Sequence, residues 1–303
     1  MGNIKIHFKC EMVFRLLYFS TFLFLLFFWF VFKIYADKGI IKKGKYLFQA
    51  SGGCSCHTNK EKDGNFLAGG RSIKTPYGIF FSTNITPDIE SGIGKWSDED
   101  FIRAMTIGVG PEGKHYFPVF PYTSFQLIRI EDLLALKAYI FSISPISQKN
   151  LPHKLILPVG RQIPMMFWKN FVWSPEYLEL NSQKTENWNR GAYLVKALAH
   201  CGECHTPRNI LGDLDYSRYM SGSKEGPEGE LAPNITPDIK TGIGNWSKVD
   251  ISFFLKNGIK PNGDYSQGSM AEVIELGYQF LTERDLNAIA EYLLSLTPID
   301  NDL

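Results

Sequence analysis

Residues 84–97 read NITPDIESGIGKWS and residues 234–247 read NITPDIKTGIGNWS, so eleven of fourteen positions are identical at an offset of 150 residues. Around each copy the same features recur in the same order: a short helical segment, a cysteine cluster ending in histidine, the repeated loop, a helix, a turn rich in glycine and proline, and a last helix. Solenoid repeats have periods of roughly 20–50 residues, so this unit is a whole small domain. The sequence therefore predicts two homologous domains in tandem.

Helix signals dominate both copies. Ser97 with Asp100, and Thr282 with Asp285, place an acidic residue three positions after an N-cap residue, close to a capping box. Apolar residues follow both pairs at helical spacing, whereas strand signals are few. We expect an all-α fold.

The repeat also sets the expected boundaries. We predict a first domain over 37–144, a linker over 145–187 and a second domain over 188–303. Within the linker, an apolar and aromatic band at 163–173 either packs across both domains or docks a partner or the bilayer.

The most specific motif is Cys201-Gly-Glu-Cys204-His205, the C-x-x-C-H pattern of c-type haem attachment. Its spacing suits two thioether bonds to the haem vinyl groups, with the adjacent histidine as an axial ligand of the iron. A redox dithiol or half of a zinc site are the alternatives, but no ligands at zinc spacing follow Cys204 except His205. Met270, the only methionine after Met220, is the candidate sixth ligand.

The first cluster, Cys54-Ser-Cys56-His57, has one residue rather than two between its cysteines. Binding both vinyl groups at this spacing requires a distorted loop, so attachment through Cys56 alone, with His57 axial, is the easier geometry. A cross-link between the two cysteines and a lost haem are the alternatives. Because the rest of the repeat is so well kept, we predict a haem c here also, and hence two in the chain.

The distal side of the first site differs as well. At the offset of 150 residues, Phe120 stands where the second copy has Met270. A phenylalanine cannot bind iron, so the first haem is either five-coordinate or ligated by His115, five residues earlier.

The N-terminus has a different composition from the rest. Residues 16–32, LLYFSTFLFLLFFWFVF, carry no charge and are just long enough to cross the ~30 Å hydrocarbon core of a bilayer. We expect residues 1–36 to be a membrane anchor with a single transmembrane helix, or alternatively a signal peptide. Over the whole chain 32 Lys and Arg nearly balance 31 Asp and Glu, which disfavours a basic face for nucleic acid.

These motifs together resemble one bacterial family. The sequence HCGECHTPRN around Cys204, the two NITPD loops, LAGGR at 67–71 and SMAEV at 269–273 are similar to the cytochrome c subunits of membrane-bound alcohol, gluconate and aldehyde dehydrogenases and to related di-haem cytochromes c. The resemblance covers residues 40–300 and implies two cytochrome c-like domains. It also implies an electron carrier between a dehydrogenase partner and quinone or a terminal oxidase.

By the same resemblance, Cys201, Cys204, His205 and Met270 occupy the covalent and axial positions of the family, as Cys56 and His57 do in the first domain and Cys54 does approximately. Haem attachment in this family takes place outside the cytoplasm. It therefore implies a bacterial inner-membrane location, with a cytoplasmic N-terminus and haem domains facing the periplasm. A di-haem peroxidase-like enzyme, with an open iron in the first domain, is the alternative function.

Overall fold

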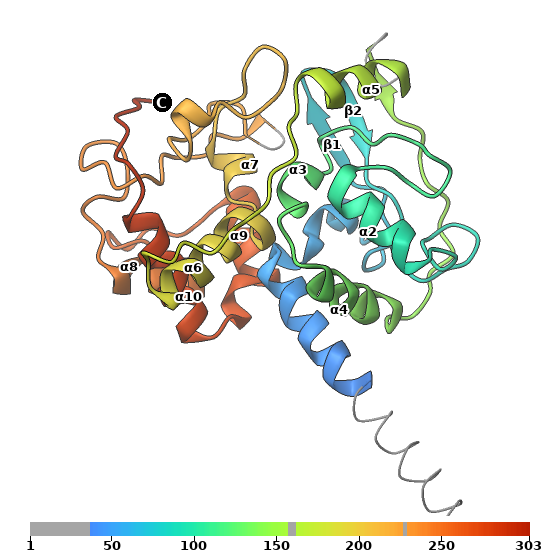
Figure 1. Cartoon of the computed structure of the whole chain (residues 1–303), viewed down its shortest axis with the longest axis horizontal. Coiled ribbons are helices and arrows are strands. Elements are labelled where there is room, and N and C mark those ends of the chain that lie inside the picture. The colour runs from blue at the N-terminus through green and yellow to red at the C-terminus, as the bar shows by residue number, and fades with distance from the viewer. Residues whose placement is uncertain (1–36, 157–161, 227–228) are drawn as a thin grey trace, which may run out of the picture.

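The structure, a computed structural model, describes residues 37–156, 162–226 and 229–303. Two domains lie side by side, and the helix over 37–50 runs between them (Figure 1). After this first helix, the α-helices are α2 (Asp98–Ile107), α3 (Tyr122–Phe125), α4 (Ile130–Phe141), α5 (Gln162–Phe171), α6 (Glu186–Tyr193), α7 (Gly202–His205), α8 (Lys248–Asn257), α9 (Gly268–Leu276) and α10 (Glu283–Leu294). The π-helix η3 (Leu194–Leu198) continues α6, and short 3-10 turns are η1 (Gly52–His57), η2 (Lys60–Lys62), η4 (Tyr216–Arg218) and η6 (Tyr278–Phe280).

Each domain is built on its first and last helices, which meet at a glycine. In domain 1 a Cβ on Gly44 would lie 1.9 Å from the carbonyl oxygen of Ala135 in α4. In domain 2 a Cβ on Gly191 would lie 2.0 Å from the carbonyl oxygen of Ala288 in α10. Only glycine allows the two helix backbones to approach so closely. The first and last helices of both domains therefore pack at the same kind of glycine contact.

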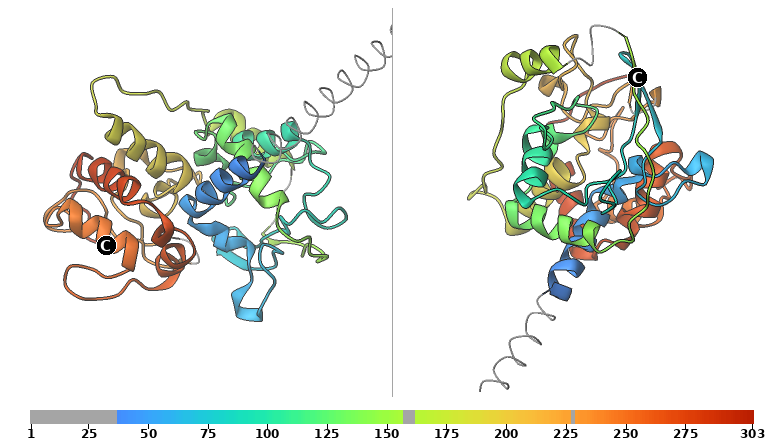
Figure 2. Two further views of the ribbon diagram at one scale, coloured as in Figure 1. Left: turned by 90° about the horizontal axis from the view of Figure 1, so that it is seen from below. Right: turned by 90° about the vertical axis from the view of Figure 1, so that its right-hand side faces the viewer.

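The two domains share one hydrophobic core. Buried side chains from the helix over 37–50, from α4, from η3 and from α10 belong to a single contiguous cluster, among them Leu47, Leu133, Leu194 and Leu286. Views from two further directions show the first helix and α9 at the boundary between the domains (Figure 2). A core that crosses the boundary holds the domains together as one unit, because separating them would expose its apolar surface.

The all-α prediction is wrong, because domain 1 contains a three-stranded antiparallel sheet. Its strands β1 (Ser72–Thr75), β2 (Gly78–Phe81) and β3 (Lys154–Leu155) lie in the order β1-β2-β3. The two residues between Thr75 and Gly78 close a tight hairpin, in which Gly78 has a φ of 123°. A Cβ at Gly78 would meet the backbone of β3, so glycine is required both for the turn and for the third strand.

The predicted membrane-spanning helix is also not supported. None of the helices in the described ranges is long and apolar enough to cross a bilayer. The helix over 37–50 carries Lys38, Lys42, Lys43 and Lys45, which explains why it does not qualify. The residues on which the span was predicted, 16–32, lie outside the described part of the chain.

The helix N-caps agree with their sequence signals. Ser97 forms a reciprocal capping box with Asp100 at the start of α2, and Ser247 forms the matching box with Asp250 at the start of α8. Thr282 caps α10 by accepting a hydrogen bond from the backbone amide of Asp285.

The repeated NITPD loops are closed by their first asparagine. Asn84 Nδ2 donates to the carbonyl oxygen of Ile146 at 2.7 Å, and Asn234 Nδ2 donates to that of Ile299 at 2.7 Å. Both asparagines are buried. The segment after α4 is thereby tied to domain 1 in the way that the C-terminal segment is tied to domain 2.

The linker helix α5 contacts both domains. Lys169 Nζ donates to the carbonyl oxygens of Ile107 and Gly108 in domain 1, each at 2.6 Å, and Trp168 Nε1 donates to that of Leu211 in domain 2 at 2.7 Å. Lys169 and Trp168 thus connect α5 to both domains, as the packing role predicts. Four apolar side chains of the band stay exposed, however, so the docking role stays a prediction: Ile163, Met166, Phe167 and Phe171.

Candidate functional site: two cysteine–histidine clusters at the domain boundary

The two cysteine clusters follow equivalent helices but have different backbones. In domain 2, Cys201 has a helical φ of −54° and leads directly into α7. In domain 1, Gly52, Gly53 and Cys54 have φ values of 74°, 69° and 47°, all in the left-handed region. The loop of domain 1 is therefore distorted, as attachment through both of its cysteines would require, and two glycines provide most of the distortion. Whether Cys54 takes part stays a prediction.

Despite this difference, Cys54 and Cys201 are in similar surroundings, since both are partly buried against the shared core. Burial raises the pKa of Tyr139 in α4 and of Tyr292 in α10, and the charge of Cys54 adds to the first shift as that of Cys201 adds to the second. Burial raises the pKa of each of the two thiols to about 12. Both are therefore neutral at ordinary pH.

The second cysteine of each cluster lies close to the domain boundary. Burial raises the pKa of Cys204 to about 12, and the neighbouring Glu203 and then Cys56 of the other domain add to this shift. The two clusters are thus near enough for charges on Cys56 and Cys204 to interact. No disulfide joins any of the four cysteines in the described part of the chain.

The two histidines are held by the same type of bond. His57 Nδ1 lies 2.7 Å from the carbonyl oxygen of Thr83, and His205 Nδ1 lies 2.7 Å from that of Pro233. A carbonyl oxygen only accepts, so Nδ1 carries the hydrogen and Nε2 keeps its lone pair for a metal. Burial lowers the pKa of both rings, which favours the neutral form that a metal requires.

The distal positions differ in chemistry. Met270 lies in the first turn of α9 and is partly buried against the core. At the equivalent place in domain 1, Phe120 is packed edge-on against Tyr116 and Phe125. The isolated bridges Val109–His115 and Ile259–Tyr265, at the same offset, show that the loops before both positions match.

His115 lies toward the linker helix. Together with Glu112, Lys114 and Met166 it lines a surface hollow beside α5. Burial lowers its pKa, and the nearby Lys169 adds to the shift. Its role as a sixth ligand stays a prediction.

Each cysteine cluster contacts the other domain. Glu203, between the cysteines of domain 2, accepts hydrogen bonds from Thr123 Oγ1 at 2.8 Å and Ser124 Oγ at 2.6 Å, both in α3 of domain 1. Arg208 Nη2 also lies 2.6 Å from Glu203. In the opposite direction, η1 of domain 1 packs against α9, the helix that carries Met270.

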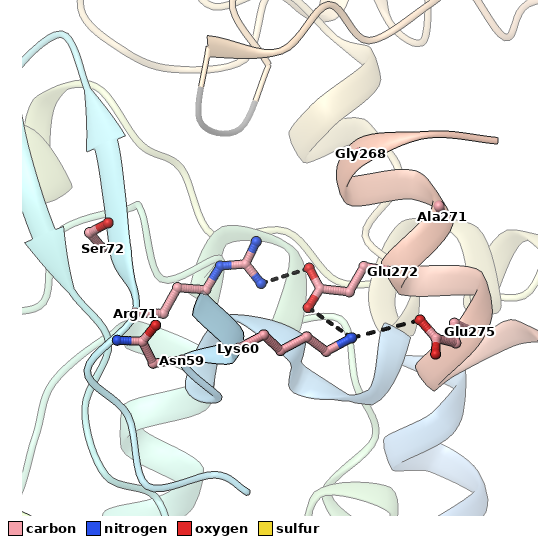
Figure 3. Close-up of a pocket in the computed structure, with 8 residues that line it drawn as sticks. All are labelled: Asn59, Lys60, Arg71, Ser72, Gly268, Ala271, Glu272 and Glu275. Atoms are coloured by element: carbon pink, nitrogen blue, oxygen red, sulfur yellow. Dashed lines mark hydrogen bonds and ion pairs between the residues drawn. The ribbon is translucent and has the colours of Figure 1, made fainter. Parts of the chain in front are cut away.

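An ion-pair cluster crosses the boundary beside η1. Arg71 Nη1 lies 2.6 Å from Glu272 Oε2, and Lys60 Nζ lies 3.5 Å from Glu272 Oε1 and 3.7 Å from Glu275 (Figure 3). Arg71 and Lys60 come from domain 1, whereas the two glutamates come from α9. These four residues line part of a cavity of about 290 Å³ at the boundary.

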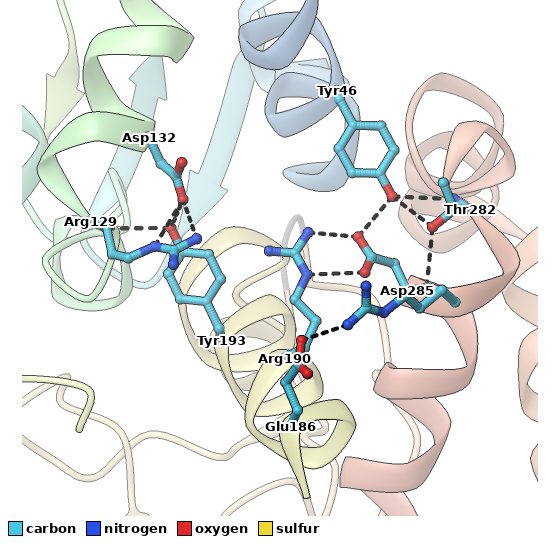
Figure 4. Close-up of polar contacts among 9 residues, drawn as sticks. Tyr46, Arg129, Asp132, Glu186, Arg190, Tyr193, Thr282 and Asp285 are labelled. Carbon is cyan, nitrogen blue, oxygen red and sulfur yellow. Dashed lines mark hydrogen bonds and ion pairs between the residues drawn. The ribbon is translucent and has the colours of Figure 1, made fainter. Parts of the chain in front are cut away.

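A second boundary network has two matched halves. Asp285 of α10 pairs with Arg190 of its own domain at 2.6 Å and accepts from Tyr46 Oη of domain 1 at 2.7 Å (Figure 4). Asp132 of α4 pairs with Lys43 of its own domain at 2.6 Å and accepts from Tyr193 Oη of domain 2 at 2.6 Å.

In both halves the tyrosine also accepts from a backbone amide at the start of the other domain's last helix. Thr282 N donates to Tyr46 Oη at 3.2 Å, and Arg129 N donates to Tyr193 Oη at 3.3 Å. Each domain therefore contributes one tyrosine to the equivalent site on the other domain, so the boundary has an approximate two-fold symmetry. We call this pair of contacts the tyrosine exchange.

The sequence named the cysteines, the histidines and Met270 as candidates, and these assignments stay predictions. It gave no sign of the boundary contacts. The two tyrosines are matched at an offset of 147 residues and the two aspartates at 153, so aligning the whole repeat rather than its central loop would have paired them. Arg71 was noticed only as part of LAGGR, and no sequence signal connects it to Glu272.

The donor set fits two c-type haems. Each cluster offers a histidine whose Nε2 keeps its lone pair, beside cysteine thiols that can add to vinyl groups. In domain 2 a thioether is also available at Met270, whereas the equivalent position in domain 1 offers only carbon. No group of three or more His, Cys, Asp and Glu side chains that could hold a bare metal ion occurs in the described residues.

No protein-family model matches the chain. It is 38% identical over 266 residues to a protein of Cereibacter sphaeroides described as diheme cytochrome c-type, covering 86% of this chain and 88% of that protein. It is 39% identical over 264 residues to the fructose dehydrogenase cytochrome subunit of Gluconobacter japonicus, covering 86% of this chain and 53% of that subunit. A gluconate 2-dehydrogenase cytochrome c subunit of Pantoea cypripedii is 36% identical over 270 residues, covering 86% of this chain and 60% of that subunit.

Proposed function

The chain belongs to the diheme c-type cytochromes, and from this premise we propose which residues hold its two haems and which proteins it connects. Membership confirms the resemblance that the motifs gave. The chain carries two covalently bound haem c groups and transfers electrons through them. The peroxidase-like alternative is not favoured, because these relatives are named as cytochromes and cytochrome subunits.

His57 and His205 would be the proximal ligands. Their Nδ1 bonds to Thr83 and Pro233 fix the ring orientation and keep Nε2 available. When bound, each haem iron takes up and releases one electron. The histidines hold the iron in place and, through their hydrogen bonds, adjust its reduction potential.

Cys201 and Cys204 would attach the haem of domain 2, and Cys54 and Cys56 that of domain 1. In each bond a thiol S–H adds across a vinyl C=C, so that sulfur binds one carbon, hydrogen goes to the other and no oxidant is consumed. Cys54 is included because, like Cys201, it is partly buried against the shared core directly after the first helix of its domain. The left-handed run that ends at Cys54 replaces the missing residue.

Met270 would be the sixth ligand in domain 2. A methionine sulfur raises the potential of a haem relative to ligation without it. Domain 1 has Phe120 at this place, so we assign the higher potential to domain 2. Electrons entering at domain 1 would then move toward domain 2 across the boundary, where the charges of Cys56 and Cys204 are near enough to interact.

The partner would be the catalytic subunit of a dehydrogenase, with quinone or a terminal oxidase on the accepting side. Two of the relatives are named as cytochrome subunits of fructose and gluconate dehydrogenases. This chain spans 53% and 60% of those subunits but 88% of the diheme protein. The periplasmic side of the bacterial inner membrane is the location that fits such an electron route and covalent haem attachment.

The observation that carries this proposal is the matched pair of histidine–carbonyl bonds at two cysteine clusters that meet at one boundary. Its test is haem quantification and redox titration of the purified full-length protein. We expect two haems per chain, two one-electron waves, and reduction of both haems by a dehydrogenase with its sugar or alcohol substrate.

One haem per chain would refute the assignment of domain 1. Rapid turnover of peroxide, with no reduction by any dehydrogenase, would refute the carrier function. Alkylation of the denatured holoprotein, followed by mass spectrometry, tests the thioethers separately, because a cysteine bound to haem takes no label.

A further inference from the structure

Helix α9 presents two different side chains to the two domains. Met270 and Glu272 are two residues apart, and an α-helix turns about 100° per residue, so their side chains leave α9 in nearly opposite directions. Glu272 reaches Arg71 in domain 1 (Figure 3), while Met270 packs on the core cluster. We propose that Glu272 is a positioning residue for Met270: its ion pair with Arg71 holds α9 where the methionine sulfur can reach the second haem. This inference rests on the proposed role of Met270.

The ion pair is placed to exert such control because it is largely buried. The side chain of Arg71 is 18% exposed and that of Glu272 is 13% exposed, with 2.6 Å between Nη1 and Oε2. Lys60 also lies 3.5 Å from Glu272, but the Arg71–Glu272 contact is the shorter of the two. Loss of so short a pair in a largely buried place costs more than loss of a surface pair. Arg71 Nη1 also lies 3.5 Å from the carbonyl oxygen of Ser55, so the same guanidinium contacts the first cysteine cluster.

The backbone of α9 is also in close contact with domain 1 at its C-terminal end. A Cβ on Gly53 would lie 2.7 Å from the carbonyl oxygen of Leu276, and a Cβ on Gly277 would lie 2.4 Å from that of Gln49. At the other end, the backbone amide of Ser269 donates to Glu230 of domain 2 at 2.9 Å. The position of α9 is therefore set by both domains, with Glu272 in between.

Position matters here because α9 is short. It has nine residues, and isolated helices below roughly 12–15 residues are marginal in water. Its placement must come from tertiary contacts. The Arg71–Glu272 pair then makes ligation in domain 2 depend on a contact with domain 1, so the state of one haem site is linked to the other.

The test uses Glu272→Gln in the full-length holoprotein, with Glu275→Gln as the matched control. Glu275 lies on the same helix and also faces Lys60, at 3.7 Å, but its side chain is 71% exposed. In Glu272→Gln we expect loss of the methionine-to-iron charge-transfer band, a lower potential for the second haem alone, and imidazole binding to that haem tightened by about tenfold or more. Glu275→Gln should match the wild type.

Two further variants approach the pair from domain 1. Arg71→Lys retains the positive charge and should retain the band, whereas Arg71→Gln should lose it. These also serve if Glu272→Gln does not yield folded holoprotein. An unchanged band and unchanged imidazole affinity in Glu272→Gln or in Arg71→Gln would overturn the proposal.

Met270→Ala separates this proposal from the one on which it rests. If Met270→Ala loses the band and Glu272→Gln keeps it, the positioning role is refuted and the ligand assignment stands. If Met270→Ala keeps the band, the ligand assignment itself is wrong.

Discussion

Domains 1 and 2 have the same frame and different haem sites. The frame consists of the glycine contacts at 44 and 191, the NITPD loops, the capping boxes and the histidine–carbonyl bonds, all of which occur twice. Domain 1 also carries the sheet, but at the haem sites themselves the differences are the cysteine spacing and the distal residue. The comparison indicates that the repeated contacts determine where a haem can bind, while a few positions determine how it is attached and which ligands its iron has.

The largest expected effect on stability comes from the boundary network of Asp285 and Asp132. The cation that pairs with Asp285 is more buried than those that pair with Asp132. Asp285 is bound through both oxygens by Arg190, which is 25% exposed, whereas Asp132 pairs with Lys43 and Arg129, which are 47% and 57% exposed. We expect Asp285→Ala to lower the free energy of unfolding by about 3–5 kcal/mol, because it leaves a partly buried guanidinium unpaired.

Asp132→Ala should cost less, about 1–3 kcal/mol, because its cationic partners can return to water. Denaturant unfolding of the holoproteins measures both. Equal losses in the two variants would mean that burial of the partner does not decide the effect.

Asp285 also makes the stability of the fold depend on pH. Burial raises the pKa of Asp285, but hydrogen bonds from Arg190 and Tyr46 outweigh burial and the net pKa is lowered. A carboxyl group with a lowered folded pKa stabilises the fold above its unfolded value of about 3.9, and that stabilisation is lost as pH falls through the folded pKa.

The difference in stability between wild type and Asp285→Asn should therefore be full at pH 6–7 and should shrink as the pH is lowered below about 4. Unfolding measured across this range checks the sign. A difference that grows in acid would contradict it.

The sequence predicted the repeat, the caps and the haem donors because each is a local pattern. The motifs C-x-x-C-H and S-x-x-D predict haem attachment and a helix N-cap, and each depends on fewer than six consecutive residues. The sheet was missed because β3 has only two residues and pairs with a hairpin more than seventy residues earlier. The tyrosine exchange and the Arg71–Glu272 pair were missed because they depend on how the domains face one another, which no local pattern records.

The glycines of the two cysteine loops are in different surroundings. Gly53 has a φ of 69°, and a Cβ there would lie 2.7 Å from a backbone oxygen of α9, whereas a Cβ at Gly202 would meet at closest a tyrosine ring carbon at 3.0 Å. We expect Gly53→Ala to destabilise the holoprotein by about 2–4 kcal/mol through strain and overpacking.

Gly202→Ala should stay within about 1 kcal/mol of the wild type, since Gly202 is helical and alanine favours a helix. Thermal unfolding of both variants is the measurement. A tolerant Gly53→Ala would show that the shorter loop does not need its left-handed backbone.

A single exchange should make the haem site of domain 1 resemble that of domain 2. Phe120→Met offers a thioether at the position equivalent to Met270, so we expect a second low-spin, methionine-ligated haem. Its potential should rise by on the order of 0.1 V, a fraction of the roughly 0.8 V over which axial ligands tune haems. Redox titration and absorption spectra measure the change, with Phe120→Leu as the control for volume. No new ligation would mean that the distal loop of domain 1 does not point at the iron.

The smallest expected effect tests the shared frame itself. Ser97 and Ser247 both accept from the backbone amide three residues later, at 3.1 and 3.2 Å. We expect Ser97→Ala and Ser247→Ala each to cost about 1 kcal/mol, and the double variant to cost about their sum, because distant caps act independently.

The two boxes differ in one respect: Asp100 also pairs with Arg103 at 2.6 Å, while among the described residues Asp250 accepts from Ser247 alone. Ser97→Ala leaves Asp100 with that partner at the helix N-terminus, so its loss should be the smaller of the two. If Ser247→Ala instead costs less in denaturant unfolding of the holoproteins, then Arg103 draws Asp100 away from the cap rather than supporting it.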